Sequence, residues 1–148
     1  MAHEVTRVTV PARPTAVVAQ VTTWEAYSKL WPALLDQVYS VVRSLDQERW
    51  QNVMLYLDDQ PSVEVGVLLE VPFEGDADGR VVASALPPGD AATTTHRGPY
   101  EGLGEAHQAV IGWCAAQGLE RTGVRWEIYG HPDEHTGQVE TEIYWQLA

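Results

Sequence analysis

The last ten residues of the chain, VETEIYWQLA, combine two glutamates with aromatic residues in a pattern typical of a β-strand. β-Branched and aromatic residues crowd together, and apolar residues recur at every second position. Because side chains alternate along a strand, we expect Glu140, Glu142 and Tyr144 on one face and Ile143 and Trp145 on the other. The acidic face is either solvated, as is common in antiparallel sheets, or a binding surface.

The composition favours a cationic ligand over a nucleic acid. The 148 residues include 21 acidic and 9 basic side chains, for a formal net charge of −12. Proteins that bind nucleic acids concentrate Lys and Arg on one face, so we expect no direct nucleic-acid partner. Six Trp and six Tyr against one Phe suit an amphipathic ligand, because both residue types join a large apolar ring to a polar group.

The chain has no run of about 18 apolar residues, and its first residues lack the pattern of a signal peptide. We therefore expect a cytoplasmic protein with no membrane partner. The single cysteine, Cys114, is interpreted as a core residue. The segment HPDEH (131–135) has the composition of a metal site, but its spacing matches no known zinc pattern. No metal and no cofactor are expected.

The chain repeats itself. Residues 8–30 align with residues 81–103 without a gap, and the same offset places Tyr56 on Tyr129. One offset that holds over so long a stretch indicates a duplication. We expect a single domain, residues 1–148, built of two repeats that span about 5–72 and about 80–148.

Each repeat carries the same order of signals: a strand, an amphipathic helix and a β-hairpin. The first helix is indicated by apolar residues at helical spacing from Leu30 to Val42, with Pro32 in its first turn. The second begins near Leu103, and Gly118 is a natural stop signal. The pattern predicts an α+β fold of two β-α-β-β modules related by a pseudo-twofold axis, with helices on one side of antiparallel sheets.

We expect the faces without helices to form a central ligand groove between the two repeats. Val65 and Val67 match Thr141 and Ile143 in the repeat, so these residues are placed under the helices, and the opposite strand positions are assigned to the groove. Gly66 would leave space for a ligand, because glycine has no side chain. The candidate ligand-binding residues are Trp24, Met54, Tyr56, Gly66, Leu68, Glu127, Tyr129, Glu142 and Tyr144.

Four segments resemble GyrI-like small-molecule-binding domains, which also occur as effector-binding domains of AraC-type and MerR-type multidrug regulators: YLDDQP (56–61), ALPPGDAATTTHRGPY (85–100), GVRWEIYG (123–130) and TEIYWQL (141–147). The resemblance covers nearly the whole chain. It implies a duplicated β-α-β-β fold whose groove, lined by aromatic residues and a buried glutamate, takes lipophilic cations. At the matching motif positions, Glu142 is implied as that glutamate and Tyr129 as part of the aromatic wall.

The implied function is the binding of amphipathic, cationic aromatic molecules for multidrug sensing or sequestration, with no catalytic residue. Two alternatives remain open. Some standalone members of the family are hydrolases that open the cyclopropane of alkylating natural products, for which Glu142 and Tyr129 would be catalytic. Others are protein inhibitors of DNA gyrase. The chain shows no DNA-binding domain, so a role in transcription would need a separate regulator protein.

Overall fold

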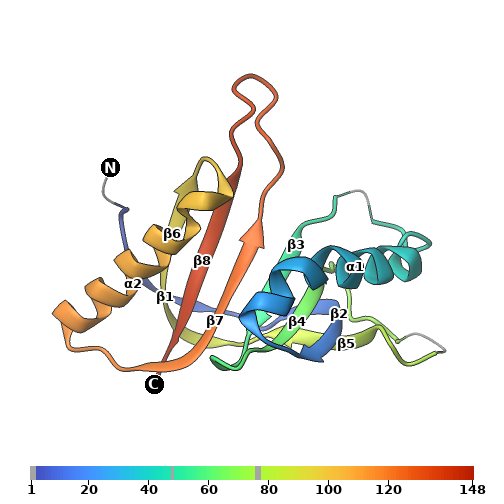
Figure 1. The fold of residues 1–148 in the computed structure, drawn as a ribbon, viewed down its shortest axis with the longest axis horizontal. Helices are drawn as coiled ribbons and strands as arrows, with labels where there is room; N and C mark the ends of the chain where they lie inside the picture. Colours follow the sequence, from blue (N-terminus) through green and yellow to red (C-terminus); the bar gives the residue numbers. More distant parts are fainter. Residues whose placement is uncertain (1–2, 48, 76–77) are drawn as a thin grey trace.

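The computed structural model describes residues 3–47, 49–75 and 78–148. Within these residues, two α-helices pack against one eight-stranded antiparallel sheet (Figure 1). The elements in chain order are β1 (Thr6–Val10), β2 (Arg13–Val21), α1 (Trp24–Val42), β3 (Asn52–Tyr56), β4 (Ser62–Leu68), β5 (Val82–Leu86), β6 (Gly89–Arg97), the 3₁₀-helix η1 (Tyr100–Gly102), α2 (Leu103–Gln117), β7 (Arg121–Tyr129) and β8 (Glu140–Leu147).

Helix α1 begins earlier than its apolar pattern predicts. The Thr23 side chain accepts a hydrogen bond from the backbone N–H of Ala26, so the helix is capped just before Trp24. Pro32 therefore lies inside the helix and not in its first turn. Helix α2 ends where predicted, because Gly118 adopts the left-handed conformation at its C-terminus. Neither helix in the described part of the chain is long and apolar enough to cross a bilayer.

The sheet has the strand order β1-β6-β8-β7-β3-β4-β2-β5. The expectation of more than one sheet is wrong, because β3 and β7 pair directly and join the two halves of the chain. From this central pair the order reads symmetrically outward. The first strand of each half crosses to the other half, so that β1 pairs with β6 and β5 pairs with β2. This arrangement agrees with two repeats, although the duplication itself stays a prediction.

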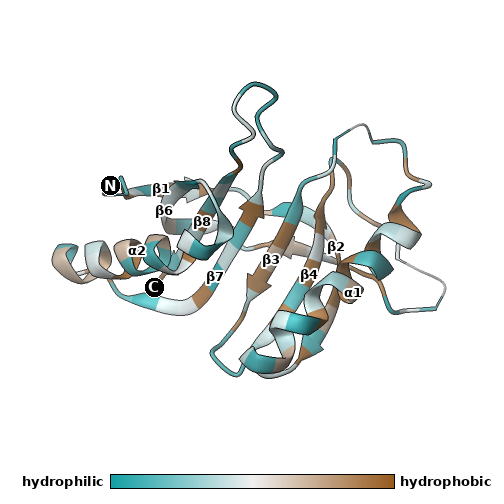
Figure 2. Ribbon diagram, turned by 45° about the horizontal axis from the view of Figure 1, so that its top comes forward, coloured by the Kyte–Doolittle hydropathy of each residue, from teal (hydrophilic) through white to brown (hydrophobic). Residues whose placement is uncertain are grey.

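Both helices cover the same face of the sheet, and the strand positions predicted beneath them are correct. Val65, Val67 and Ile143 are fully buried on this face, Val65 and Val67 in the α1 core and Ile143 in the α2 core. Leu34 and Val38 of α1 are buried with them. Figure 2 shows the hydrophobic stretches of β3 and β4 near α1.

The opposite face of the sheet is also buried, although the sequence pattern predicts an open groove there. Strands β1 and β2 lie far apart in the strand order, yet only Pro11 and Ala12 separate them in the chain. The sheet must therefore curl strongly to bring them together. The curl brings β1 and β5 toward the centre of this face. A second core fills the space that was expected to be a groove: Val53, Leu55, Leu68, Leu86, Ala91, Trp126 and Ile128.

Gly66 allows β4 to approach β2 closely and leaves no room for a ligand. A Cβ atom at this position would lie 1.8 Å from the carbonyl oxygen of Ala16 on β2. The absent side chain therefore allows close approach of two backbones. The expectation that Gly66 opens space in a groove is wrong for this reason.

We predict that Gly66→Ala lowers the free energy of unfolding by about 2 kcal/mol or more, because backbone atoms of β2 cannot move aside. Gly112→Ala is the matched control. Gly112 is exposed in α2 and a Cβ there would meet nothing within 4 Å, so alanine should stabilise the protein by about 0.5–1 kcal/mol. Urea unfolding measures both values, and equal effects of the two substitutions would contradict the close approach.

Candidate functional site

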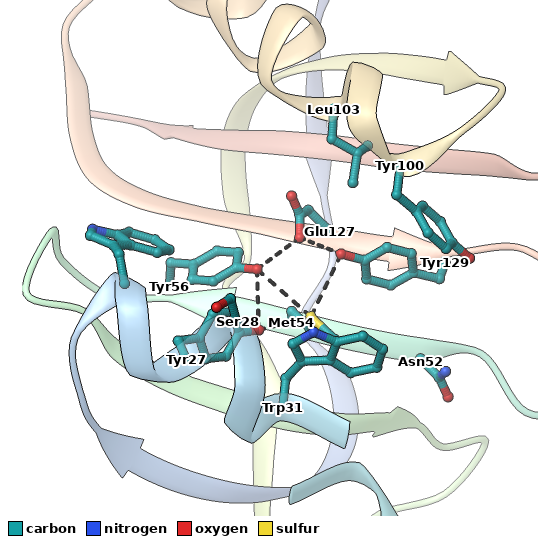
Figure 3. Close-up of a pocket in the computed structure, with 11 residues that line it drawn as sticks. Tyr27, Ser28, Trp31, Asn52, Met54, Tyr56, Tyr100, Leu103, Glu127 and Tyr129 are labelled. Atoms are coloured by element: carbon teal, nitrogen blue, oxygen red, sulfur yellow. Dashed lines mark hydrogen bonds between the residues drawn. The ribbon is translucent and has the colours of Figure 1, made fainter. Parts of the chain in front are cut away.

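A cavity of about 370 Å³ lies on the helix side of the sheet, between α1 and the segment formed by η1 and α2 (Figure 3). Strands β3 and β7 supply its floor, and aromatic side chains dominate its walls. The lining residues are Trp24, Tyr27, Ser28 and Trp31 of α1, Asn52, Met54 and Tyr56 of β3, Tyr100 and Leu103 of η1 and α2, and Glu127 and Tyr129 of β7.

The pairing between β3 and β7 decides which side chains form the floor. Met54 lies opposite Glu127, and Glu127 lies opposite Ile143 of β8. Directly paired residues of antiparallel strands point to the same face. Since Ile143 is packed under α2, Met54 and Glu127 also point toward the helices. Tyr56 and Tyr129, two positions further along their strands, share this face.

Glu127 is the charged group of the cavity floor. Its side chain is 7 % exposed. One carboxylate oxygen, Oε1, accepts hydrogen bonds from the hydroxyls of Tyr56 at 2.9 Å and Tyr129 at 2.6 Å. The other, Oε2, lies 2.7 Å from Nε2 of His107 on α2. Burial raises the pKa of Glu127, but the hydrogen bonds from these three residues, together with the attraction of the His107 ring when it is protonated, outweigh burial and hold the pKa below its ordinary value.

His107 is linked in turn to β8. The indole Nε1–H of Trp145 donates to Nδ1 of His107 at 3.0 Å. Trp145 is 6 % exposed and the side chain of His107 is 17 % exposed. A chain of hydrogen bonds therefore runs from the indole through the imidazole to the carboxylate of Glu127.

Two pairs of tyrosines flank the carboxylate with nearly equal geometry. The rings of Tyr27 and Tyr56 are 5.7 Å apart at 82°, and those of Tyr100 and Tyr129 are 5.6 Å apart at 84°. Burial, and then the negative charge of Glu127, raises the pKa of Tyr56 and of Tyr129 well above the ordinary value. These two hydroxyls therefore remain protonated and act as donors.

Arg125 lies behind the aromatic wall. Its guanidinium group is 5.5 Å from the ring centroid of Trp24 and 5.6 Å from that of Tyr56, and it pairs with Asp59 at 2.8 Å. The indole N–H of Trp24 donates to the carbonyl oxygen of Asp59 at 2.9 Å. The hairpin between β3 and β4 thus holds Trp24 at the edge of the cavity.

Residues 3–148 match the family described as GyrI-like small molecule binding domain. The chain belongs to this family. No curated protein matches it. Among solved structures, the EcmrR C-terminal domain is 20 % identical, with a TM-score of 0.77 and coverage of 100 % of this chain and 99 % of that one. A hydrolase from Listeria innocua is 14 % identical, with a TM-score of 0.60 and coverage of 99 % and 93 %.

A third solved structure, SAV2435 bound to tetraphenylphosphonium, is 10 % identical to this GyrI-like domain. Its TM-score is 0.56, and the match covers 100 % of this chain and 94 % of that one. At identities this low, the three structures show a shared fold.

Five of the candidate residues named from the sequence meet in the cavity of this GyrI-like domain: Trp24, Met54, Tyr56, Glu127 and Tyr129. The other four, Gly66, Leu68, Glu142 and Tyr144, are on the opposite face of the sheet. The expectation that one face of the sheet carries all eight strand residues among these candidates is wrong. The alternation within each strand is correct, but the register between strands reverses the face of β3 and β7 relative to that expectation.

Glu142 has local partners on that opposite face. Its Oε1 accepts a hydrogen bond from the Tyr144 hydroxyl at 2.6 Å, and the Tyr144 ring stacks on Trp126 at 5.4 Å and 9°. Burial, and then the hydrogen bond to Glu142, raises the pKa of Tyr144 to about 12. Glu142 and Tyr129, the pair named for hydrolysis, therefore lie on different faces and cannot act on one ligand.

Several residues of the site were not named as candidates from the sequence, among them Tyr27, Trp31, Tyr100 and His107. Trp31 belongs to the apolar pattern of α1 but is 36 % exposed at the cavity. The repeat contained a usable signal for two of them, because its offset aligns Tyr27 with Tyr100. No sequence signal points to His107, since its role depends on how α2 lies over β7.

His96 and the HPDEH loop (131–135) take part in local hydrogen bonds. His96 Nε2 is 2.8 Å from the carbonyl oxygen of Pro99, so the ring holds the turn before η1. In the HPDEH loop, Asp133 accepts hydrogen bonds from the backbone N–H groups of His135 and Thr136. Across the described residues, no three His, Cys, Asp or Glu side chains are placed to hold a metal ion.

The lowered pKa of Glu127 predicts a pH-dependent contribution to stability. Because the carboxyl is more acidic in the folded protein than in the unfolded chain, the stabilisation is present above the unfolded pKa of about 4.5 and is lost as pH falls through the folded pKa. Glu127→Gln should lower the free energy of unfolding by about 1–3 kcal/mol near pH 7. In urea unfolding, this difference should shrink below about pH 4.5; a difference that grew in acid would contradict the hydrogen-bond account.

Proposed function

We propose that this GyrI-like domain binds lipophilic aromatic cations in the cavity between α1 and α2, for sensing or sequestration. The observation that carries the proposal is the carboxylate of Glu127, buried in a cavity with aromatic walls. Among the described residues that line this cavity, Glu127 alone bears a formal charge. An anion in such surroundings attracts a cation more strongly than it would in water.

The hydrogen bonds to Glu127 stabilise its charge without cancelling it. Two of the three donors are neutral tyrosine hydroxyls. The guanidinium of Arg125 lies on the same strand face, but it is paired with Asp59. A bound cation would therefore supply the missing positive charge. The rings of Trp31 and Tyr100 are partly exposed at the cavity, and each ring face offers a cation–π attraction of roughly 0.5–2 kcal/mol when desolvated.

The fold comparison supports the same class of ligand. Tetraphenylphosphonium, bound in the SAV2435 structure, is a cation whose charge is enclosed by aromatic rings. Such a molecule has no N–H or O–H to donate, so its binding would depend on charge and on ring contacts. A carboxylate that already accepts three hydrogen bonds suits a ligand of this kind.

Glu127→Gln should weaken binding of methyltriphenylphosphonium by about 2–5 kcal/mol, because the substitution removes one partner of a buried charge pair. Triphenylphosphine oxide, a neutral molecule of similar shape, should bind almost as well to the variant as to the parent. Isothermal titration calorimetry of both ligands gives the comparison.

Glu142→Gln is the matched control for this experiment. Glu142 also accepts a tyrosine hydroxyl at 2.6 Å, but it lies on the opposite face of the sheet. Its substitution should leave cation affinity unchanged. If Glu142→Gln weakened cation binding and Glu127→Gln did not, the ligand would occupy the opposite face and the proposed site would be abandoned.

Hydrolysis of cyclopropane-bearing electrophiles is the second candidate function, favoured by the hydrolase among the structures with the same fold. In this cavity Glu127 would replace Glu142 as the acid that acts with Tyr129, since the two are hydrogen-bonded at 2.6 Å. Water would add to a ring carbon while the strained C–C bond breaks and the other carbon gains a proton.

Mass spectrometry separates this candidate from simple binding. The protein is incubated with a cyclopropane-bearing alkylating agent, and the water adduct is quantified. Under the binding proposal, we expect no more adduct than forms without protein. Turnover beyond one equivalent that is lost in Glu127→Gln would establish the hydrolase instead.

A further inference from the structure

We propose that Trp145 sets the charge of the ligand cavity by holding His107 as a neutral hydrogen-bond donor to Glu127, so that the cavity keeps a full negative charge for a cation. Trp145 and His107 would then be positioning residues that act through Glu127. This inference rests on the proposed function and extends it to how the site is kept ready.

The hydrogen-bond chemistry of the two side chains carries the first step. An indole nitrogen can only donate, so Nδ1 of His107, 3.0 Å from Nε1 of Trp145, must present a lone pair. A carboxylate can only accept, so Nε2, 2.7 Å from Oε2 of Glu127, must carry the hydrogen. Both contacts are satisfied together by one form of the ring, the neutral tautomer with hydrogen on Nε2.

Protonation of His107 would break this arrangement. A second hydrogen on Nδ1 would face the N–H of Trp145, and two buried donors would be left without acceptors. The imidazolium would also form an ion pair with Glu127 and so cancel the charge that a ligand cation needs. Trp145 is 6 % exposed, so water cannot readily replace the lost hydrogen bond.

The charged groups around the pair have opposing effects on His107. The guanidinium groups of Arg121 and Arg125 lie 4.9 Å and 5.1 Å from the centroid of the Trp145 ring. Positive charges beside the indole that contacts His107 disfavour the protonated form of its imidazole. Glu127 favours that form, and the hydroxyls of Tyr56 and Tyr129 reduce this effect because they share its carboxylate.

The consequence is a cation site whose affinity is insensitive to pH across the range in which histidine usually titrates. Histidine beside a carboxylate is commonly a pH switch. Here the indole of Trp145 would keep His107 neutral, so the histidine would not act as a pH switch. Without the indole N–H, Nδ1 becomes free to take a proton, and cation binding should weaken in mild acid.

Trp145→Phe tests the inference, because phenylalanine keeps an aromatic ring and lacks the N–H. Methyltriphenylphosphonium affinity is measured by calorimetry between about pH 5.5 and about pH 8.5. The parent should vary by less than about threefold. The variant should bind about tenfold or more weakly at the acidic end than at the alkaline end, in the range of a close desolvated charge pair. In Trp145→Phe/His107→Gln, which has no imidazole at this position, the pH dependence should disappear.

A Trp145→Phe profile as flat as that of the parent would overturn the inference, and so would a parent as steep as the variant. Either result leaves the proposed function standing as long as Glu127→Gln still abolishes the preference for the cation. If Glu127→Gln left the preference for the cation unchanged at every pH, the proposed function itself would be overturned.

A measurement on the unsubstituted protein covers the case in which Trp145→Phe fails to fold. Long-range ¹H–¹⁵N NMR of the histidine rings reports which nitrogen carries hydrogen. His107 should show hydrogen on Nε2 and a lone pair on Nδ1, unchanged down to about pH 5.5. Hydrogen on Nδ1 near neutral pH would refute the proposed role of Trp145 without any reference to ligand.

Discussion

The pairing of Met54 with Glu127 at the centre of the β3–β7 ladder is the contact on which the site depends. It joins the two halves of the chain into one sheet and turns the carboxylate toward the helices. Two residues further along each strand, Tyr56 and Tyr129 then reach the same oxygen from opposite sides. A slip of one residue in this register would place Glu127 in the core of the opposite face.

The two central residues, Met54 and Glu127, have to differ if the cavity is to hold one negative charge. Two glutamates facing each other across the ladder would repel, and one of them would take up a proton. Two methionines would leave the cavity without an anion. With one of each, the tyrosine hydroxyls also approach a polarisable sulfur, at 3.7 Å from Tyr56 and 3.6 Å from Tyr129. A nearly symmetric set of aromatic residues thus surrounds a single off-centre charge.

The sequence predicts the family and both helices. It also predicts the buried positions of β4 and β8, because those strands alternate between apolar and other residues. It does not predict the register of β3 and β7. Met54, Leu55, Trp126 and Glu127 are all buried, so neither strand has a polar face that would fix its orientation. The repeat offers the missing constraint: its offset aligns Met54 with Glu127, and residues related by a twofold axis can meet across an antiparallel pair. The role of His107 depends on helix packing and leaves no such trace.

The exchange of β1 and β5 between the two halves limits how a ligand can enter. Each half contributes an edge strand to the other, so the halves are fastened at both margins as well as along β3 and β7. A hinge that opened the cavity like a clamshell would have to break one of these ladders. Rotamer changes of the partly exposed rings at the rim, Trp31 and Tyr100, would then be the simplest way to widen the opening. An opening formed by side chains would change its shape while the backbone beneath it stays in place.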